Sequence, residues 1–193
     1  MINAVTVYCA SSPNIDQHYF DAASQLAEIL VKNNVTIVYG GGSTGLMGQV
    51  ADTAIQHKGH VIGIIPEFME KIEWGHNGIS ELRIVGDMHE RKKKMADAVD
   101  AVIALPGGCG TMEELLEVIT WKRLGIFTKP IIIINTKGYY EPLIAMLKKS
   151  IEEKFMGGRH KGMWKVINTP EMIMEAIEQS EPWDKDAIKF AKD

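Results

Sequence analysis

The chain has 193 residues, of which 46% are hydrophobic and 24% are charged, and its formal net charge is −4. This length and composition predict one soluble globular domain with a sizeable core, and the acidic balance argues against general nucleic-acid binding. No apolar run approaches the roughly 20 residues that cross a bilayer, so we expect no membrane partner. With two cysteines, Cys9 and Cys109, and no secretory signal, we expect free thiols and a cytoplasmic protein.

The first half of the chain alternates short apolar runs with amphipathic segments. Strands are predicted over residues 4–9, 35–39, 61–65 and 81–85. Helices are predicted over residues 16–32, from about 45 to 58, and over 87–98. Residues 67–79 have a mixed composition and are expected to form a loop or short helix over the sheet edge.

The second half continues the alternation. Strands are predicted over residues 101–105, 131–134 and 164–167, and helices over 111–124, 139–154 and 170–179. The strands are continuously apolar, which indicates burial on both faces. We therefore predict an α/β fold with a doubly wound parallel sheet, a Rossmann-like single domain over residues 1–180, and a polar C-terminal tail over 181–193.

The stretch Leu105 to Glu114 is the most informative part of the sequence. An apolar run ends there in Pro-Gly-Gly-Cys-Gly-Thr, and a helical pattern follows. Three glycines in four positions let the backbone approach a ligand, and Thr111 is expected to cap the helix. A phosphate would be held by the free N–H groups of the first turn, with Glu114 facing the rest of the molecule. The alternative is an ordinary strand-to-helix turn with a capping box formed by Thr111 and Glu114.

A second glycine loop follows the strand that ends at Tyr39. It fits the pattern G-x-G-x-x-G at Gly40, Gly42 and Gly45, and Glu67 follows where a dinucleotide fingerprint requires an acidic residue. Such loops are common in parallel sheets, and the lysine of a Walker A loop is missing. A dinucleotide therefore stays an alternative ligand.

The charged run that starts at Arg91 is ambiguous. A solvated helix face is the ordinary interpretation, but Arg91 shares its helix face with Met88 and Met95. The preceding His89-Glu90 pair is not a zinc motif, because Lys93 stands where the second histidine is required. We expect no metal and no cofactor.

Three segments together resemble the LOG ("Lonely guy") family: residues 39–48, 88–92 and 106–114, the last with the hallmark pattern P-G-G-x-G-T-x-x-E. The resemblance covers most of residues 4–180. It implies a phosphoribohydrolase, which cleaves the N-glycosidic bond of adenosine-type nucleoside 5′-monophosphates to give free base and ribose 5-phosphate. Family members act on cytokinin riboside monophosphates, and many also on AMP, as an AMP nucleosidase does. A carboxylate suits this chemistry because the ribosyl centre becomes positively charged.

The resemblance also assigns roles to residues. It implies that Glu114 and Arg91 are catalytic and that Met88 touches the base. Only the family pattern assigns the catalytic role to Glu114 and not to its neighbour Glu113. The residues expected to bind phosphate and ribose are Ser12, Gly42, Ser43, Thr44, Gly107, Gly108, Gly110 and Thr111.

The family is typically dimeric, so the resemblance implies a homodimer with the site near the interface. An apolar cluster of Trp121, Leu124, Ile126 and Phe127 suits such a contact, and core packing explains it equally well. Ala10, Arg123 and Phe127 depart from the family's common residues and put the substrate's identity in doubt. A lysine decarboxylase, a label that some members carry, would need pyridoxal chemistry for which the chain is short. The serious alternative is a non-catalytic nucleotide- or dinucleotide-binding module.

Overall fold

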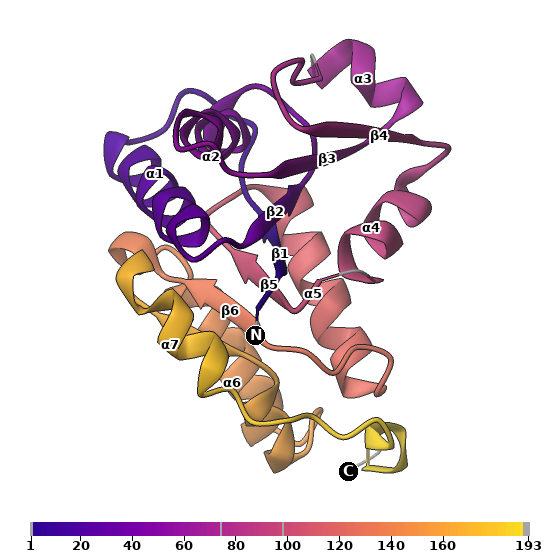
Figure 1. Ribbon diagram of the computed structural model, residues 1–193. Helices are drawn as coiled ribbons and strands as arrows, with labels where there is room; N and C mark the ends of the chain where they lie inside the picture. The colour runs from indigo at the N-terminus through magenta and orange to yellow at the C-terminus, as the bar shows by residue number, and fades with distance from the viewer. Residues whose placement is uncertain (1, 74, 98, 191–193) are drawn as a thin grey trace.

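The computed structural model describes residues 2–73, 75–97 and 99–190 (Figure 1). At its centre lies a seven-stranded sheet in the order β4-β3-β2-β1-β5-β6-β7, and all six strand pairs are parallel. The strands are β1 (Ala4–Tyr8), β2 (Thr36–Tyr39), β3 (Val61–Pro66), β4 (Glu81–Val85), β5 (Ala101–Ala104), β6 (Ile131–Ile134) and β7 (Lys165–Ile167). The predicted doubly wound parallel sheet is confirmed.

Helices cover both faces of the sheet. They are α1 (Gln17–Lys32), α2 (Gly45–Gln56), α3 (Glu67–Glu73), α4 (Met88–Asp97), α5 (Cys109–Arg123), α6 (Glu141–Glu152) and α7 (Ile173–Glu178). Helices α1, α2 and α7 pack on one face, whereas α4, α5 and α6 pack on the other. The described residues also form four short 3-10 helices: η1 (Thr136–Gly138), η2 (Gly158–Met163), η3 (Pro170–Met172) and η4 (Ala187–Phe190).

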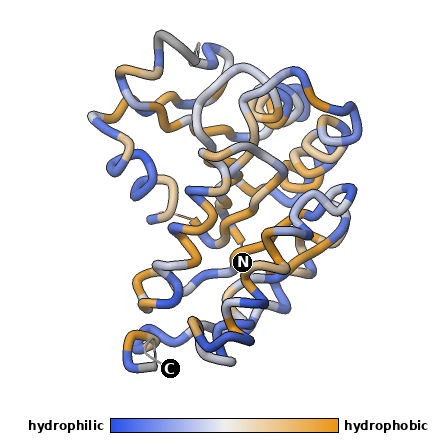
Figure 2. Tube along the Cα trace, turned by 180° about the vertical axis from the view of Figure 1, so that it is seen from behind, coloured by the Kyte–Doolittle hydropathy of each residue, from blue (hydrophilic) through white to orange (hydrophobic). Residues whose placement is uncertain are grey.

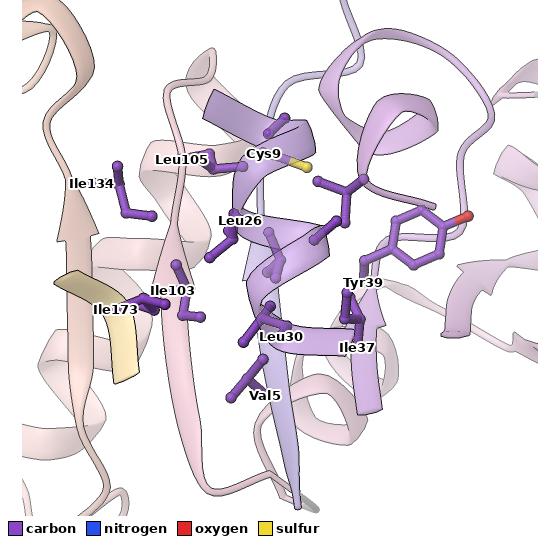
Figure 3. Close-up of a cluster of buried hydrophobic side chains, with 14 of the residues drawn as sticks. Val5, Cys9, Leu26, Leu30, Ile37, Tyr39, Ile103, Leu105, Ile134 and Ile173 are labelled. Carbon is purple, nitrogen blue, oxygen red and sulfur yellow. The ribbon is translucent and has the colours of Figure 1, made fainter. Parts of the chain in front are cut away.

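The central strands are mostly apolar because both of their faces are covered, whereas the edge strands β4 and β7 also contain the charged residues Glu81, Arg83 and Lys165. In β6, Ile132 and Ile134 belong to the core under α1, α2 and α7, while Ile131 and Ile133 belong to the opposite core. Figure 3 shows the first of these cores, where Leu26 and Leu30 of α1 point toward the strands. In Figure 2 the hydrophobic strands accordingly lie at the centre of the molecule, with hydrophilic residues on the outer turns.

The predicted start of α5 is wrong by two residues. The helix begins at Cys109 and its N-cap residue is Gly108, with backbone angles φ −80° and ψ −157°, so Thr111 lies inside the first turn. Thr111 is therefore not the N-cap, and the alternative capping box of Thr111 and Glu114 does not form at this helix start. A Cβ on Gly107 would lie 2.1 Å from Thr111 Oγ1, so the threonine hydroxyl is packed against the turn instead.

The helix predicted over residues 139–154 is confirmed as α6, which is two residues shorter at each end. The 3-10 helix η1 precedes it, and Lys137 and Gly138 have positive φ angles of 56° and 72° there. Residues 170–179 divide into η3 and α7. The predicted helix end at residue 98 lies outside the described residues.

The segment expected to be a polar tail packs against the end of α5 as far as it is described. Trp183 Nε1 donates a hydrogen bond of 2.6 Å to Lys122 O, and Ala187 is fully buried. Residues 191–193 lie outside the described residues, and the domain boundary at residue 180 stays a prediction. Cys9 and Cys109 are free thiols, as expected. Within the described ranges, no helix is long and apolar enough to span a membrane.

Candidate active site at the switch point of the sheet

A cavity of about 320 Å³ opens at the carboxyl end of β1. The sheet order reverses between β1 and β5, since β1 pairs with β2 on one side and with β5 on the other. The loops that leave two such strands diverge and create a crevice, which is where open parallel sheets bind their ligands. The cavity is lined by the end of β1 and its loop, by the N-terminal turn of α5, and by side chains of α4.

The N-terminal turn of α5 forms one wall. Gly108 and Gly110 line the cavity, and a Cβ added to either would have no atom within 4 Å, so both glycines face open space. The first N–H groups of a helix have no acceptor within the helix, and its dipole is positive at this end. This wall therefore suits an anion such as phosphate.

Arg91 forms a second wall and is only 5% exposed. Its Nε donates to Ile64 O at 3.1 Å, and its Nη2 donates to Gly40 O at 3.0 Å. Its Nη1 lies 3.8 Å from Met88 Sδ and 3.9 Å from Met69 Sδ. Two of its nitrogens are thus tied to backbone carbonyls, which holds the positive charge at the edge of the cavity.

Gly40 has a structural role that its place in a dinucleotide pattern did not suggest. A Cβ on Gly40 would lie 2.2 Å from Arg91 Nη2, so the guanidinium occupies the space where any other residue would place its side chain. The end of β2 therefore requires glycine here in order to hold the arginine.

Glu114 lies in the first turns of α5, lines the cavity and is 8% exposed. Its negative charge affects the pKa values of two neighbouring side chains, Cys9 and Tyr8. Burial raises the pKa of the Cys9 thiol, the negative charge of Glu114 raises it further, and Arg91 opposes this increase. Tyr8 has a pKa raised in the same way, by burial first and by Glu114 second. Cys9 is therefore kept as a neutral thiol and is not a nucleophile at neutral pH.

The neighbouring Glu113 also lines the cavity but differs in its surroundings. Its Oε1 accepts a bond of 2.7 Å from Lys92 Nζ, and its side chain is 54% exposed. Glu113 is thus neutralised by an ion pair at the rim, whereas Glu114 is buried.

The sequence analysis missed Lys92, which is 7% exposed. Its Nζ joins Glu113 and Glu117 at 2.7 and 3.2 Å and so ties α4 to α5. Burial lowers the pKa of Lys92, but the hydrogen bonds to both glutamates outweigh this and raise it above its ordinary value. The sequence signal that could have indicated the burial of Lys92 was its spacing of four residues from Met88 and Ala96, which face inward.

The structure brings most of the predicted site residues to the cavity, within the part of the chain that it describes. Those that line it are Ser12, Met88, Arg91, Gly108, Gly110, Thr111 and Glu114; those that do not are Gly42, Ser43, Thr44 and Gly107. The 42–44 loop instead supports the loop after β1, since Thr44 Oγ1 donates to Ser11 O at 3.0 Å.

Four methionines contribute to the apolar part of the lining: Met47, Met69, Met88 and Met95. Only Met88 was expected there. Methionine adapts its shape and contacts aromatic rings favourably, so this wall suits a planar base. Among the described residues, no group of three His, Cys, Asp or Glu side chains is arranged to hold a metal ion.

A helix N-terminus rich in glycine, a buried arginine and a buried glutamate surround one cavity, and this arrangement suits a phosphorylated small molecule. Comparison with known proteins specifies the class. Residues 47–177 match the family model described as "Possible lysine decarboxylase". The chain is 42% identical over 188 residues to a probable cytokinin riboside 5′-monophosphate phosphoribohydrolase of Oryza sativa subsp. japonica, covering 97% of this chain and 77% of that one.

A second relative is a cytokinin riboside 5′-monophosphate phosphoribohydrolase of Arabidopsis thaliana, 43% identical over 178 residues, with 92% of this chain and 83% of that one covered. The chain belongs to this family, the LOG phosphoribohydrolases, which are N-glycosyl hydrolases. A solved structure of the molybdenum cofactor carrier protein of Chlamydomonas reinhardtii shares the fold, with a TM-score of 0.70, 17% identity, and 93% and 98% of the two chains covered.

Proposed function

We propose that this chain hydrolyses the N-glycosidic bond of adenosine-type nucleoside 5′-monophosphates and releases free base and ribose 5-phosphate. The observation that carries the proposal is that Glu114, Arg91 and the N-terminal turn of α5 line one cavity. The names of the relatives support this substrate class.

The 5′-phosphate would bind at the N-terminal turn of α5, at Gly108, Gly110 and Thr111, and Ser12, which lines the same cavity, would assist. The predicted residues that do not line the cavity would act indirectly, by supporting the loop after β1 and the turn before α5. These residues are Gly42, Ser43, Thr44 and Gly107. Binding the phosphate away from the reacting bond positions the ribose, and this remote binding energy lowers the barrier of the chemical step.

Hydrolysis breaks the bond between C1′ of the ribose and the base nitrogen, and a water oxygen forms the new bond to C1′. The ribosyl centre is positively charged in the transition state, as in other glycoside hydrolyses. The Glu114 carboxylate would stabilise that charge and accept a proton from the attacking water. The leaving base gains a proton in exchange for the one that Glu114 takes up and later releases, so one water molecule is divided between the two products, the neutral base and ribose 5-phosphate.

Arg91 would act beside Glu114. Because Ile64 O and Gly40 O hold two of its nitrogens, the guanidinium has one fixed orientation and needs no rearrangement during the reaction. Its remaining nitrogen points toward Met69 and Met88, the side of the cavity proposed for the base. This placement suits stabilisation of the negative charge that develops on the departing base.

The direct test is to incubate the purified protein with AMP and, separately, with N6-isopentenyladenosine 5′-monophosphate. Released base and ribose 5-phosphate are quantified by chromatography, and both are expected in equal amounts. The ratio of the two kcat/KM values identifies the preferred nucleotide. Tight binding of both nucleotides without any release of base would instead indicate a non-catalytic nucleotide-binding module.

We also propose a homodimer with its interface beside the site. On the outer face of α5 and the following loop, Leu116 is 38% exposed and Ile126 is 70% exposed, and Trp121 lies between them in sequence. A groove along this face includes Cys109 and Glu113, which also line the cavity. Covering these apolar side chains with a second copy would place the interface next to the substrate.

The two free thiols suit a reducing compartment such as the cytoplasm.

A further inference from the structure

Two adjacent tyrosines reach from the segment after β6 to the turn that precedes α5. Tyr139 Oη donates to Gly107 O at 2.7 Å, and Tyr140 Oη donates to Leu105 O at 2.8 Å. These carbonyls stand on either side of Pro106. Neither tyrosine lines the cavity, so both hydroxyls act on the turn from behind.

The segment that carries the tyrosines is firmly anchored. Asn135 is 3% exposed, its Oδ1 accepts from Tyr140 N at 2.7 Å, and its Nδ2 donates to Glu141 Oε1 at 2.7 Å. Lys137 Nζ forms an ion pair of 2.8 Å with Asp16 Oδ2, at the N-cap of α1. The hydroxyl of Tyr139 is therefore presented from a fixed support.

The rings of these tyrosines are also packed. The Tyr139 ring centroid lies 5.1 Å from that of Tyr140 and 6.0 Å from that of Tyr19, and both pairs meet edge to face. Such contacts depend on the rings and not on the hydroxyls. A phenylalanine at position 139 would keep this packing and lose only the hydrogen bond to Gly107 O.

The bond from Tyr139 fixes more than one carbonyl. The peptide group is planar, and in a trans peptide the C=O of one residue points opposite to the N–H of the next. Holding Gly107 O toward Tyr139 therefore turns the Gly108 N–H away from Tyr139. Gly108 lines the cavity, and its own carbonyl is occupied by the helix, since it accepts from Met112 N at 3.0 Å.

We infer that Tyr139 is a positioning residue for phosphate binding: its hydroxyl holds the 107–108 peptide so that the Gly108 N–H faces the 5′-phosphate. The inference rests on the proposed function, because it places phosphate at this turn. Tyr140 has a different role. The Leu105 carbonyl belongs to the peptide bond with Pro106, which has no N–H to orient. Its hydrogen bond satisfies a buried carbonyl and stabilises the fold.

The test compares Tyr139→Phe, Tyr140→Phe and Tyr19→Phe with the unchanged protein. Calorimetry measures the Kd of ribose 5-phosphate, thermal unfolding measures Tm, and base release from AMP gives kcat and KM. For Tyr139→Phe we expect the Kd of ribose 5-phosphate and the KM for AMP to rise about 10-fold. This is the effect of losing one hydrogen bond to a charged group, here the bond from the Gly108 N–H to the phosphate. Its kcat is expected to stay within about threefold, because the Glu114 carboxylate is untouched.

The matched variants separate positioning from stability. Tyr140→Phe is expected to lower Tm by about 2–6 °C and to leave the Kd of ribose 5-phosphate unchanged. Tyr19→Phe removes a hydroxyl from the same ring cluster and is expected to change neither quantity. An unchanged Kd in Tyr139→Phe, or an equal loss of affinity in Tyr140→Phe, would overturn the inference.

Failure of the proposed function gives a different result. If the unchanged protein binds ribose 5-phosphate but releases no base from AMP, hydrolysis is wrong, and the Kd series still decides the role of Tyr139. If ribose 5-phosphate does not bind the unchanged protein at all, no phosphate is held at this turn and the inference is overturned.

Discussion

Lys122 illustrates how one buried charge affects the stability of the whole chain. It is 2% exposed, and its Nζ donates to Lys129 O at 2.7 Å and lies 5.7 Å from the Trp183 ring centroid. Burial lowers the pKa of Lys122 to about 8. The unfolded chain, with an ordinary lysine pKa near 10.4, therefore binds more protons than the folded chain between these two values, so this residue's contribution to stability rises with pH across that window.

Replacement of Lys122 by methionine removes this contribution. Relative to the unchanged protein, the free energy of unfolding of Lys122→Met should fall by up to about 3 kcal/mol between pH 7 and pH 10.5. Denaturant unfolding at a series of pH values measures it, with Lys148→Met as a control for loss of an exposed lysine. Parallel curves for Lys122→Met and the unchanged protein would contradict a buried ammonium with a lowered pKa.

The residues of the site differ in how visible they are in the sequence. Arg91 was set apart from the basic run by its helix face, which it shares with Met88 and Met95, and the family resemblance then implied its catalytic role. Both methionines line the cavity. Lys92 was not recognised as a buried residue, because a run of four basic residues is typical of a solvated helix face. Its spacing from Met88 and Ala96 was a local signal of burial, but its ion pairs with Glu113 and Glu117 of α5 leave no pattern in the sequence of α4.

At the scale of the elements, the two glycine turns have different tasks. Gly45 has a positive φ of 62°, and a Cβ there would lie 2.4 Å from the Ser11 carbonyl carbon, so this loop is packed against backbone. Gly110, in α5, faces open space in the cavity. The first glycine serves close packing of two loops, and we propose that the second leaves room for the ligand.

Alanine at each position should separate these tasks. Gly45→Ala is expected to lower the free energy of unfolding by at least about 2 kcal/mol, through strain and a backbone clash. Gly110→Ala should leave it unchanged or raise it by up to about 1 kcal/mol, because alanine favours helix. Its kcat/KM for AMP should nevertheless fall at least about 10-fold, because the added methyl group occupies space proposed for the phosphate. Thermal unfolding and the base-release assay measure the two effects, and a Gly110→Ala variant with undiminished kcat/KM would exclude phosphate from this turn.

Element boundaries were less predictable than the elements themselves. The strands were located within one or two residues, because burial on both faces makes the central strands mostly apolar. The start of α5 was misplaced because threonine is a common N-cap, whereas Gly108 takes that position here without a side-chain bond. The functions of Tyr139 and Tyr140 depend on contacts with residues more than 30 positions away, so no local pattern indicated them.

At the scale of the whole molecule, the alternation of strands and helices was enough to predict a parallel doubly wound sheet. The strand order and its reversal between β1 and β5 come only from the structure. That reversal explains why Ser12 and the α5 turn, about a hundred residues apart, line one cavity.

The proposed dimer is tested by placing a charge on the apolar face of α5. Leu116→Glu and Ile126→Glu are each expected to convert the dimer to a monomer with the mass of one 21.5 kDa chain. Size-exclusion chromatography with light scattering measures the mass. Met146→Glu, at a position on α6 that is 62% exposed, is the matched control and should stay dimeric. Unchanged mass in both α5-face variants would place the interface elsewhere.

The decisive measurement compares turnover of AMP by Glu114→Gln and by Glu113→Gln under saturating substrate. If the buried carboxylate performs the chemistry, Glu114→Gln should lower kcat by about 10²–10⁴, as loss of an acid–base group does. Glu113→Gln, which alters only the rim carboxylate that pairs with Lys92, should stay within about threefold of the unchanged protein. Wild-type turnover in Glu114→Gln, or a larger loss in Glu113→Gln, would contradict the catalytic role of Glu114.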